Sequence, residues 1–286
     1  MDLVQDPGWT CPTTLDAERL RAEVIATYGR VARRPRAGDF HFPVGADHAV
    51  HTLGYDAAAV AALPPGCSAR FAGVGNPLLA GPVPAGAVVL DHACGAGLDL
   101  LLALRAAGAR GRAFGVDLTP AMRDAARDAA AAAGHAAQVE IVAASFDALP
   151  LPDDGVDVVL SNGVLNLATD KLQVLREAHR VLRPGGALYL ADVVLDRELS
   201  PLARGNAALW AACVGGALSE PALLGALARA GFADRRIVAR HDPFGGTALP
   251  LKFGRDLAVS SVTLAARKRA AAGLVPPGPP QRPSTP

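Results

Sequence analysis

The stretch VLDHACGAGLDLLLAL, residues 89–104, decides the fold of this chain. An apolar run that ends at Asp91 predicts a buried strand, and the apolar run that begins near Leu98 predicts a helix. Between them lies a turn with Gly95 and Gly97, whose missing side chains let the backbone approach a ligand closely. A strand, a glycine turn and a helix in this order are typical of a nucleotide-like cofactor site in a doubly wound sheet.

Strand and helix patterns continue to alternate after this stretch. Strands are expected over 87–93, 111–118, 138–145, 156–167 and 187–195, with closing, antiparallel strands over 234–241 and 257–268. The first five are apolar on both faces, as parallel strands covered by helices require. The predicted fold class is therefore α/β, with a doubly wound, mostly parallel seven-stranded sheet of the Rossmann-like type.

The rest of the chain is organised around this sheet. Helical spacing of apolar residues over 15–34 predicts an amphipathic helix, and a segment rich in glycine and proline follows it. We expect three parts: an N-terminal helix with a lid or cap segment (1–84), the Rossmann-like domain (85–270) and a proline-rich, disordered tail (271–286).

Composition excludes several classes of function. A net charge of +1, with basic and acidic residues interspersed, argues against a dedicated nucleic-acid surface. No apolar run reaches the roughly 18 residues of a membrane span, and no secretory signal is visible, so a cytoplasmic protein is expected. The four cysteines lie far apart without zinc-ligand spacing, so no metal site is predicted. A protein partner is left open.

The end of the second predicted strand carries a candidate ribose ligand. Asp117 lies 20 residues after Gly97 in the sequence GVDL, where its carboxylate can accept hydrogen bonds from both hydroxyl groups of a ribose. The dinucleotide pattern G-x-G-x-x-G requires a glycine where this chain has Leu100. The pattern therefore disfavours NAD.

The segment from Val88 to about Ala266 resembles the class I S-adenosylmethionine-dependent methyltransferases. Within that class, SNGVLNL (161–167), CVGGALS (213–219) and GVGNP (73–77) resemble the arsenite methyltransferase family. The resemblance implies S-adenosylmethionine as cofactor, with its methionine part at the glycine turn and its adenine after the third strand. The cofactor contacts expected in this way are Asp91, Ala93, Gly95, Gly97, Asp117, Leu118, Ser145, Phe146 and Asn162, the last at the lip of the methyl site.

Two departures from the family concern the cofactor. Ala93 replaces a loop glycine; its methyl group is tolerated where φ is negative and strained where φ is positive. Ser145 stands where the family usually carries an acidic residue that receives the adenine amino group. A hydroxyl can still accept that hydrogen bond, but more weakly than a carboxylate does.

A third departure concerns the acceptor. Gly163 and Val74 occupy positions where relatives carry cysteine, and Cys213 is retained. One thiolate cannot build a trigonal site for soft As(III), so arsenic methylation is disfavoured. Cys213 and Asp192 are the candidate catalytic residues, each with a structural alternative: Cys213 as a buried remnant that lines the pocket, and Asp192 as a cap of its loop.

These observations favour methyl transfer from S-adenosylmethionine to a small organic acceptor, in specialised metabolism. The cofactor is already activated, so catalysis requires positioning and exclusion of water, and no general base can be read from the sequence. Two alternatives remain open because fold does not fix function. One is a methyltransferase-like protein that no longer methylates and instead catalyses an elimination or cyclisation, or binds a small metabolite. The other is a structural partner subunit.

Overall fold

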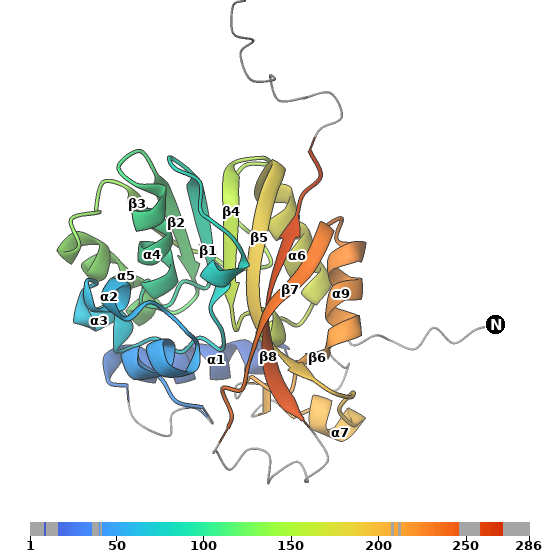
Figure 1. Ribbon diagram of the computed structural model, residues 1–286. Helices are drawn as coiled ribbons and strands as arrows, with labels where there is room; N and C mark the ends of the chain where they lie inside the picture. Colours follow the sequence, from blue (N-terminus) through green and yellow to red (C-terminus); the bar gives the residue numbers. More distant parts are fainter. Residues whose placement is uncertain are drawn as a thin grey trace, which may run out of the picture.

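The structure of the chain is a computed structural model that describes residues 9, 17–35, 40, 42–206, 209–210, 213–245 and 258–270. The predicted disordered tail, 271–286, lies outside the described residues. Because alternating apolar strands and helices can bury their faces only against one another, these residues fold into a sheet with helices on both sides (Figure 1).

The sheet contains eight strands within the described part of the chain, seven of them along the path β3-β2-β1-β4-β5-β8-β7. The strands are β1 (Val88–His92), β2 (Arg112–Asp117), β3 (Val139–Ala143), β4 (Val156–Asn162), β5 (Leu182–Leu195), β6 (Leu218–Ser219), β7 (Ala233–His241) and β8 (Val259–Arg267). The first five run parallel, whereas β8 is antiparallel to both β5 and β7. The predicted fold class is confirmed.

The fourth strand is shorter than expected. It ends at Asn162, and residues 165–167 form the short helix η3 (Leu165–Leu167) instead of continuing the strand to residue 167. Gly163 has a φ of +70°, which is outside the β region, so the chain turns there. This turn places the residues after β4 at the edge of the sheet where ligands bind.

Each face of the sheet has its own apolar layer. Val89, Val158 and Leu160 pack with α4 (Leu98–Ala107) and η2 (Pro77–Ala80) on one face. On the other face, Leu90 and Val159 pack with α6 (Lys171–Val181) and α9 (Glu220–Arg229). Successive residues of a strand point to opposite faces, which is why both kinds of position are apolar.

Helix α5 (Pro120–Ala132) packs on β2 and β3 and carries α1 (Ala17–Arg33), the predicted N-terminal helix. The segment after α1 contains η1 (His48–Thr52), α2 (Ala57–Ala61) and α3 (Pro65–Ser68). In Figure 1 this segment lies across the lower ends of β1 and β2, where those strands meet their following loops. Its position suits the expected lid or cap segment, and that assignment stays a prediction. The small helix α7 (Pro201–Arg204) lies beyond β5.

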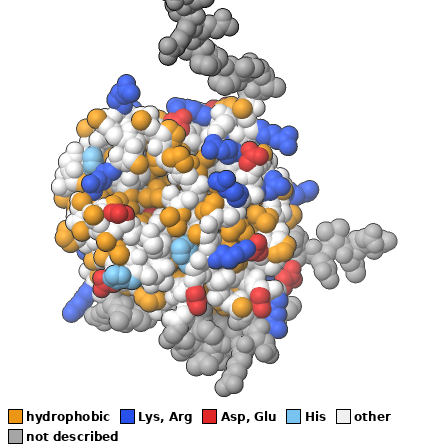
Figure 2. Space-filling view, viewed as in Figure 1, with side chains coloured by type: hydrophobic (Ala, Val, Ile, Leu, Met, Phe, Trp, Pro, Cys, Tyr) orange, Lys and Arg blue, Asp and Glu red, His pale blue; other side chains and the backbone are white. Residues whose placement is uncertain are grey.

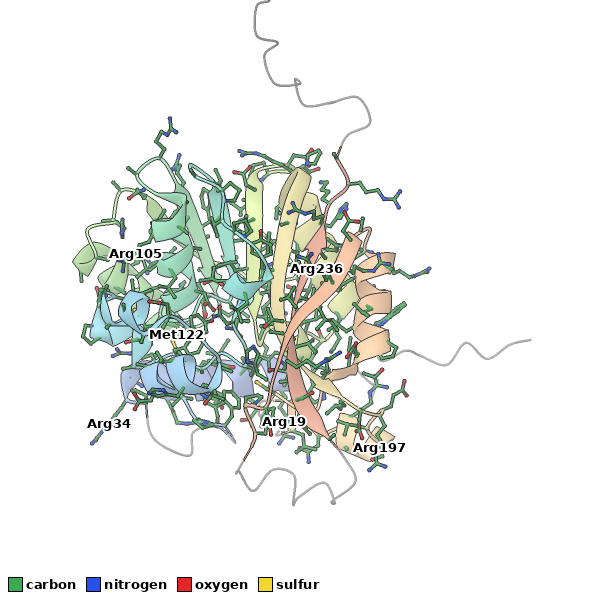
Figure 3. All side chains as sticks on the ribbon, viewed as in Figure 1. Arg19, Arg34, Arg105, Met122, Arg197 and Arg236 are labelled. Atoms are coloured by element: carbon green, nitrogen blue, oxygen red, sulfur yellow. The ribbon has the colours of Figure 1, made fainter. Side chains whose placement is uncertain are left out.

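The surface agrees with the even charge balance. On the face shown in Figure 2, basic and acidic side chains are interspersed among uncharged ones. None of the helices in the described ranges is long and apolar enough to span a bilayer. Figure 3 shows the corresponding distribution of side chains: Arg34 extends outward, whereas Met122 lies inside, where the N-terminal segment meets α5.

Candidate functional site

A cavity lies at the carboxyl ends of β1, β2 and β4, under the N-terminal segment. Its empty volume, which includes space open to solvent, is about 870 Å³. Seven of the predicted cofactor contacts line it: Asp91, Ala93, Gly95, Asp117, Leu118, Phe146 and Asn162. The N-terminal segment adds Val24, Tyr28, Cys67, Arg70 and Phe71 to the walls.

The glycine turn follows β1 directly. Gly95 and Gly97 have φ of +52° and +90°, and Gly97 caps the N-terminus of α4. A Cβ at Gly95 would meet no atom within 4 Å, so this stretch of backbone is open to a ligand. Ala93 has a φ of +50°, the strained case, which costs an L residue about 1 kcal/mol.

Ala93→Gly is therefore expected to raise the free energy of unfolding, by up to about 1 kcal/mol, because glycine adopts this conformation without the Cβ penalty. Urea denaturation would measure the change. Ala96, in the same turn, has no positive φ and is buried. As a control, Ala96→Gly should destabilise the protein by roughly 0.5–1 kcal/mol. A loss of stability in Ala93→Gly would contradict the interpretation that the positive φ strains Ala93.

Asp117, at the end of β2, is buried and holds the turn. Its Oδ2 accepts a hydrogen bond from the backbone of Gly95 at 3.0 Å, and its Oδ1 accepts one from Thr119 at 2.7 Å. Burial raises the pKa of Asp117, partly offset by these bonds. A carboxylate has about four acceptor positions, so two remain for the hydroxyl groups of a ribose.

Two more carboxyl groups, Asp91 and Asp99, line the same cavity. Burial, with the charges of Asp99 and Asp117, raises the pKa of Asp91 well above its usual range. Burial raises the pKa of Asp99 to about 6, against hydrogen bonds that lower it. Among the described residues, Oδ2 of Asp91 is buried with no hydrogen-bond partner. Three buried carboxyl groups around one volume favour a positively charged ligand.

Asn162, at the end of β4, ties the N-terminal segment to the sheet. Its Oδ1 accepts hydrogen bonds from the backbone of Val74 and Gly75 at 2.9 and 3.2 Å. Its Nδ2 donates to Asp99 and to the carbonyl oxygen of Gly75, both at 2.9 Å, and to the hydroxyl of Tyr55 at 3.2 Å. Asn162 lines the cavity as expected, but its amide is engaged in fixing the loop around Gly75.

Tyr55 and Asp99 were missed by sequence reasoning. The Tyr55 hydroxyl donates to Oδ1 of Asp99 at 2.5 Å, and Asp99 is almost fully buried. A single acid in the otherwise apolar run LDLLLAL is a signal that could have indicated Asp99. The sequence holds no comparable signal for Tyr55, because its partners come from two distant segments.

Comparison with known proteins decides the family. A sequence profile of a methyltransferase domain matches residues 84–239, more than half of the chain. The chain belongs to the class I S-adenosylmethionine-dependent methyltransferases. S-adenosylmethionine is the cofactor that this membership assigns.

Individual proteins with similar sequences or structures are also methyltransferases or share the methyltransferase fold. An arsenite methyltransferase of Halobacterium salinarum is 38% identical over 180 residues, 63% of this chain and 46% of the relative. The crystal structure of an arsenic(III) S-adenosylmethionine methyltransferase from Chlamydomonas reinhardtii is 30% identical, with a TM-score of 0.67 over 82% of this chain and 76% of that one. The cyclase SpnF shares the fold, at 20% identity and a TM-score of 0.58 over 92% and 99% of the two chains. The chain spans about half the length of the curated relatives it matches.

The residues present fit the cofactor. The unpartnered Oδ2 of Asp91 and the open backbone at Gly95 suit the ammonium end, and Asp117 suits the ribose. Leu118 and Phe146 line the same cavity, and their contact with adenine stays a prediction. In this methyltransferase the donor set, three carboxyl groups and a backbone turn, matches a cationic nucleoside.

Gly97 and Ser145 are the two expected cofactor contacts that do not line the main cavity. Gly97 instead faces α5, where a Cβ added to it would meet Cβ of Ala126 at 3.6 Å. Ser145 lines a smaller neighbouring pocket, beside the ion pair of Arg21 and Asp147 (3.7 Å), and its Oγ is buried without a hydrogen-bond partner in the described part of the chain. Its contact with adenine stays a prediction.

Asp192 is a buried residue of β5 whose carboxylate faces the loop after β4, and it does not line the main cavity. Its Oδ2 accepts hydrogen bonds from the backbone of Leu165 and Asn166, and its Oδ1 accepts from the side chain of Asn166 at 2.8 Å and the backbone of Val193 at 2.7 Å. Of the two roles considered for Asp192, this geometry favours the loop cap.

Cys213 is fully buried behind Tyr28 and does not line the main cavity. Its Sγ lies 3.9 Å from the Tyr28 hydroxyl, and burial raises the pKa of its thiol to about 12. Tyr28 itself reaches the cavity wall. At neutral pH the thiol is protonated, which favours its reading as a buried remnant over that of a nucleophile.

The two positions that lost cysteine lie against each other. A Cβ at Gly163 would meet Cγ2 of Val74 at 3.5 Å. Burial raises the pKa of Cys67, which lines the cavity, to about 11, so that thiol is protonated as well. No group of three or more His, Cys, Asp or Glu residues that could hold a metal ion occurs within the described ranges.

The carboxyl groups predict a pH dependence of binding. A cationic cofactor interacts more favourably with ionised carboxylates, and Asp99 ionises near pH 6. We expect the affinity for S-adenosylmethionine to rise from pH 5 to pH 7, by up to roughly tenfold per unit below pH 6, and then to level off. Calorimetry at several pH values would measure it.

The stability of the ligand-free protein should depend on pH in the opposite direction, falling as the pH rises. The folded-state pKa of Asp99 lies above its unfolded value of 3.8, so the folded protein binds more protons between these values. Its contribution to the free energy of unfolding is therefore present below about pH 4 and is lost as the pH rises through 6. Asp99→Asn should reduce the pH dependence of both the cofactor affinity and the free energy of unfolding. A cofactor affinity that falls with rising pH would contradict this interpretation.

Proposed function

We propose that this protein transfers a methyl group from S-adenosylmethionine to a small organic acceptor. One observation carries the proposal: a single cavity joins the ribose acid Asp117, the open turn at Gly95 and the unpartnered carboxyl oxygen of Asp91 to an apolar wall. That wall is made by side chains of the N-terminal segment and of the loop after β4, namely Val24, Tyr28, Phe71, Val164 and Leu167.

The chain's residues supply positioning and an electrostatic environment. When bound, the sulfonium supplies an already activated methyl group. Asp91, Asp99 and Asp117 orient the positively charged ligand, and the apolar wall excludes water and holds the acceptor. Asp99, with a pKa of about 6, is the cavity group best suited to accept a proton from an acceptor that must lose one.

Arsenite is a poor acceptor for this site. Soft As(III) requires thiolates, and the two positions where relatives carry cysteine hold Val74 and Gly163 instead. Cys67 and Cys213 are protonated at neutral pH because burial raises the pKa of each thiol. An apolar wall and neutral thiols together support an organic acceptor.

The cellular compartment and the biological role of the protein are also part of the proposal. Buried free thiols at Cys67, Cys94 and Cys213 are typical of a reducing compartment, which supports the cytoplasm. A role in specialised metabolism and an additional protein partner stay predictions.

Calorimetric titration with S-adenosylmethionine tests the cofactor. We expect a dissociation constant below about 100 µM, equivalent to ~5.5 kcal/mol. If neither heat nor a thermal shift is detected, the proposal is wrong. Binding of the cofactor without formation of S-adenosylhomocysteine across a panel of organic acceptors would favour the alternative, a protein of this fold that catalyses an elimination or cyclisation or binds a metabolite.

A titration with arsenite tests the acceptor. The wild-type protein should neither bind arsenite nor form S-adenosylhomocysteine in its presence. A Val74→Cys/Gly163→Cys variant, which restores two adjacent thiols, is the positive control and should gain arsenite binding. The positive φ of Gly163, +70°, makes the second cysteine cost about 1 kcal/mol of stability. Arsenite-dependent turnover by the wild type would overturn the organic acceptor.

A further inference from the structure

Two walls of the cavity come from segments that are far apart in the chain. Helix α1 contributes Val24 and Tyr28, and the loop after β4 contributes Val164 and Leu167. The spacing of these two walls sets how tightly the cavity encloses a ligand and how easily the ligand leaves. A side chain that fixes this spacing therefore acts on the function of the site without lining it.

Trp210, in the segment between α7 and β6, supports α1 from outside the cavity. Its side chain is fully buried and forms one apolar cluster with Leu20 and Val24 of α1. Its indole Nε1 donates a hydrogen bond to the carbonyl oxygen of Arg204 at 2.7 Å, which fixes the plane of the ring. Val24 lines the cavity and Trp210 does not, so the indole backs the α1 wall.

Lys171, the first residue of α6, joins this support to the second wall. It is almost fully buried, which is rare for a lysine. Its Nζ lies over the Trp210 ring, 4.5 Å from the ring centre, and donates to the carbonyl oxygen of Ala168 at 2.9 Å. Ala168 directly follows Leu167 of the second wall. The ammonium group therefore contacts both the loop after β4 and the residue that supports α1.

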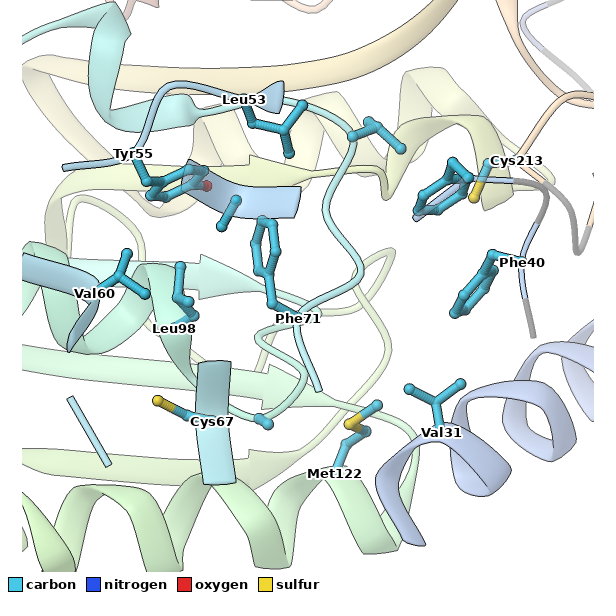
Figure 4. Close-up of a cluster of buried hydrophobic side chains, with 14 of the residues drawn as sticks. Val31, Phe40, Leu53, Tyr55, Val60, Cys67, Phe71, Leu98, Met122 and Cys213 are labelled. Carbon is cyan, nitrogen blue, oxygen red and sulfur yellow. The ribbon is translucent and has the colours of Figure 1, made fainter. Parts of the chain in front are cut away.

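A second contact with α1 lies three residues after Trp210. The backbone N–H of Cys213 donates to the carbonyl oxygen of Trp210 at 2.8 Å, and its Sγ lies 3.9 Å from the Tyr28 hydroxyl. Cys213 belongs to the buried cluster shown in Figure 4, together with Phe40 and with Val31 of α1. Because α1 rests on this segment at two points, a displacement of Trp210 would also displace the wall.

We propose that Lys171 is a positioning residue: through Trp210 it holds α1 at a fixed distance from the loop after β4 and keeps the cavity closed around a bound ligand. This inference rests on the proposed function. An ammonium group attracts the face of an indole ring, most strongly where water is excluded, so the ring is held in one place. Without this attraction α1 moves away from the cavity more readily, and a bound ligand should dissociate faster.

The test uses Trp210 as its own reporter, because the chain has only two tryptophans. In a Trp9→Phe background, all tryptophan emission comes from Trp210. Binding of S-adenosylmethionine should change this emission, since Trp210 packs against the helix that covers the ligand. Stopped-flow measurements with S-adenosylhomocysteine then give the association and dissociation rate constants.

Lys171→Met removes the charge and keeps a long side chain in the same place. We expect S-adenosylhomocysteine to dissociate roughly tenfold faster, which matches the loss of one desolvated cation–π contact, while association changes by less than about threefold. The ligand-dependent change in Trp210 emission should fall to less than about half. Lys171→Arg keeps a cation over the ring and should restore most of both properties.

Lys268→Met is the matched control. The Nζ of Lys268 forms an ion pair with Asp154 at 2.6 Å, and its backbone bonds to Gly185 and Gly186 near the start of β5, at the end of the sheet away from the cavity. Its loss should lower stability and leave both the dissociation rate and the Trp210 emission change as they are. Urea denaturation of each variant separates effects on stability from effects on position.

Each outcome decides the inference. If Lys171→Met changes only stability, as Lys268→Met does, Lys171 is a structural residue and the inference is wrong. If calorimetry shows binding but Trp210 emission does not respond, α1 is not coupled to the ligand, which also overturns it. Should Lys171→Met not fold, Trp210→Phe weakens the same contact, and an unchanged dissociation rate in that variant contradicts the inference. If the wild type binds neither ligand, the proposed function itself fails.

Discussion

Asp117→Ala is expected to abolish measurable binding of S-adenosylmethionine, with a dissociation constant raised at least roughly 100-fold. The substitution removes the proposed ribose contact and also the bonds from Asp117 to the backbone of Gly95 and Thr119. Charge-assisted hydrogen bonds contribute about 1.5–3 kcal/mol each, so losing several accounts for such a change. Calorimetry measures it directly.

A surface acid on the same side of the sheet provides the control. Asp124 is 71% exposed and pairs with Arg127 on α5. Asp124→Ala should leave the affinity unchanged, because exposed ion pairs contribute little. Retained cofactor binding in Asp117→Ala would show that the ribose assignment is wrong.

Asn162→Ala is expected to lower the free energy of unfolding by about 3 kcal/mol or more and to weaken cofactor binding strongly. The amide makes five hydrogen bonds, which join the end of β4 to Val74, Gly75, Tyr55 and Asp99. Leaving buried polar groups without partners costs about 1–3 kcal/mol each. Urea denaturation gives the stability, and hydrogen exchange should show faster opening at residues 73–75.

Gln138 offers a matched amide far from the cavity. Its Nε2 donates to the carbonyl oxygens of Gly108, Ala109 and Gly111, at the opposite end of the sheet. Gln138→Ala should lower stability while cofactor affinity stays constant. Equal losses of affinity in Asn162→Ala and Gln138→Ala would mean that Asn162 acts only through global stability.

The sheet was predictable because its signals are local. Apolar runs that end in glycine, proline or a capping residue mark strands and helices wherever they occur. The side chains of Asp56 and Asp170 cap α2 and α6, whereas Thr119 and Ser219 occupy the cap positions of α5 and α9 without a side-chain bond. The extent of the fourth strand was wrong, since Gly163 reverses the backbone before the apolar run ends.

The site was predictable only where it follows the sheet. Asp91, Gly95, Asp117 and Asn162 line the cavity because carboxyl ends of parallel strands meet at one edge. Asp192 lies within β5, which continues to Leu195, and its carboxylate faces the loop after β4. A place on a neighbouring strand of the sheet does not by itself bring a side chain into the cavity.

The sequence by itself determined the fold, the cofactor class and the absence of two family cysteines. Each of these features can be recognised from a short, continuous stretch of residues. Only the tertiary structure decided that Ala93 takes a positive φ, that Tyr55, Asp99 and Asn162 form one network, and that Arg70 lines an acidic cavity. These features depend on contacts between segments far apart in the chain. Local patterns cannot encode such contacts, because they form only when the N-terminal segment packs over the sheet.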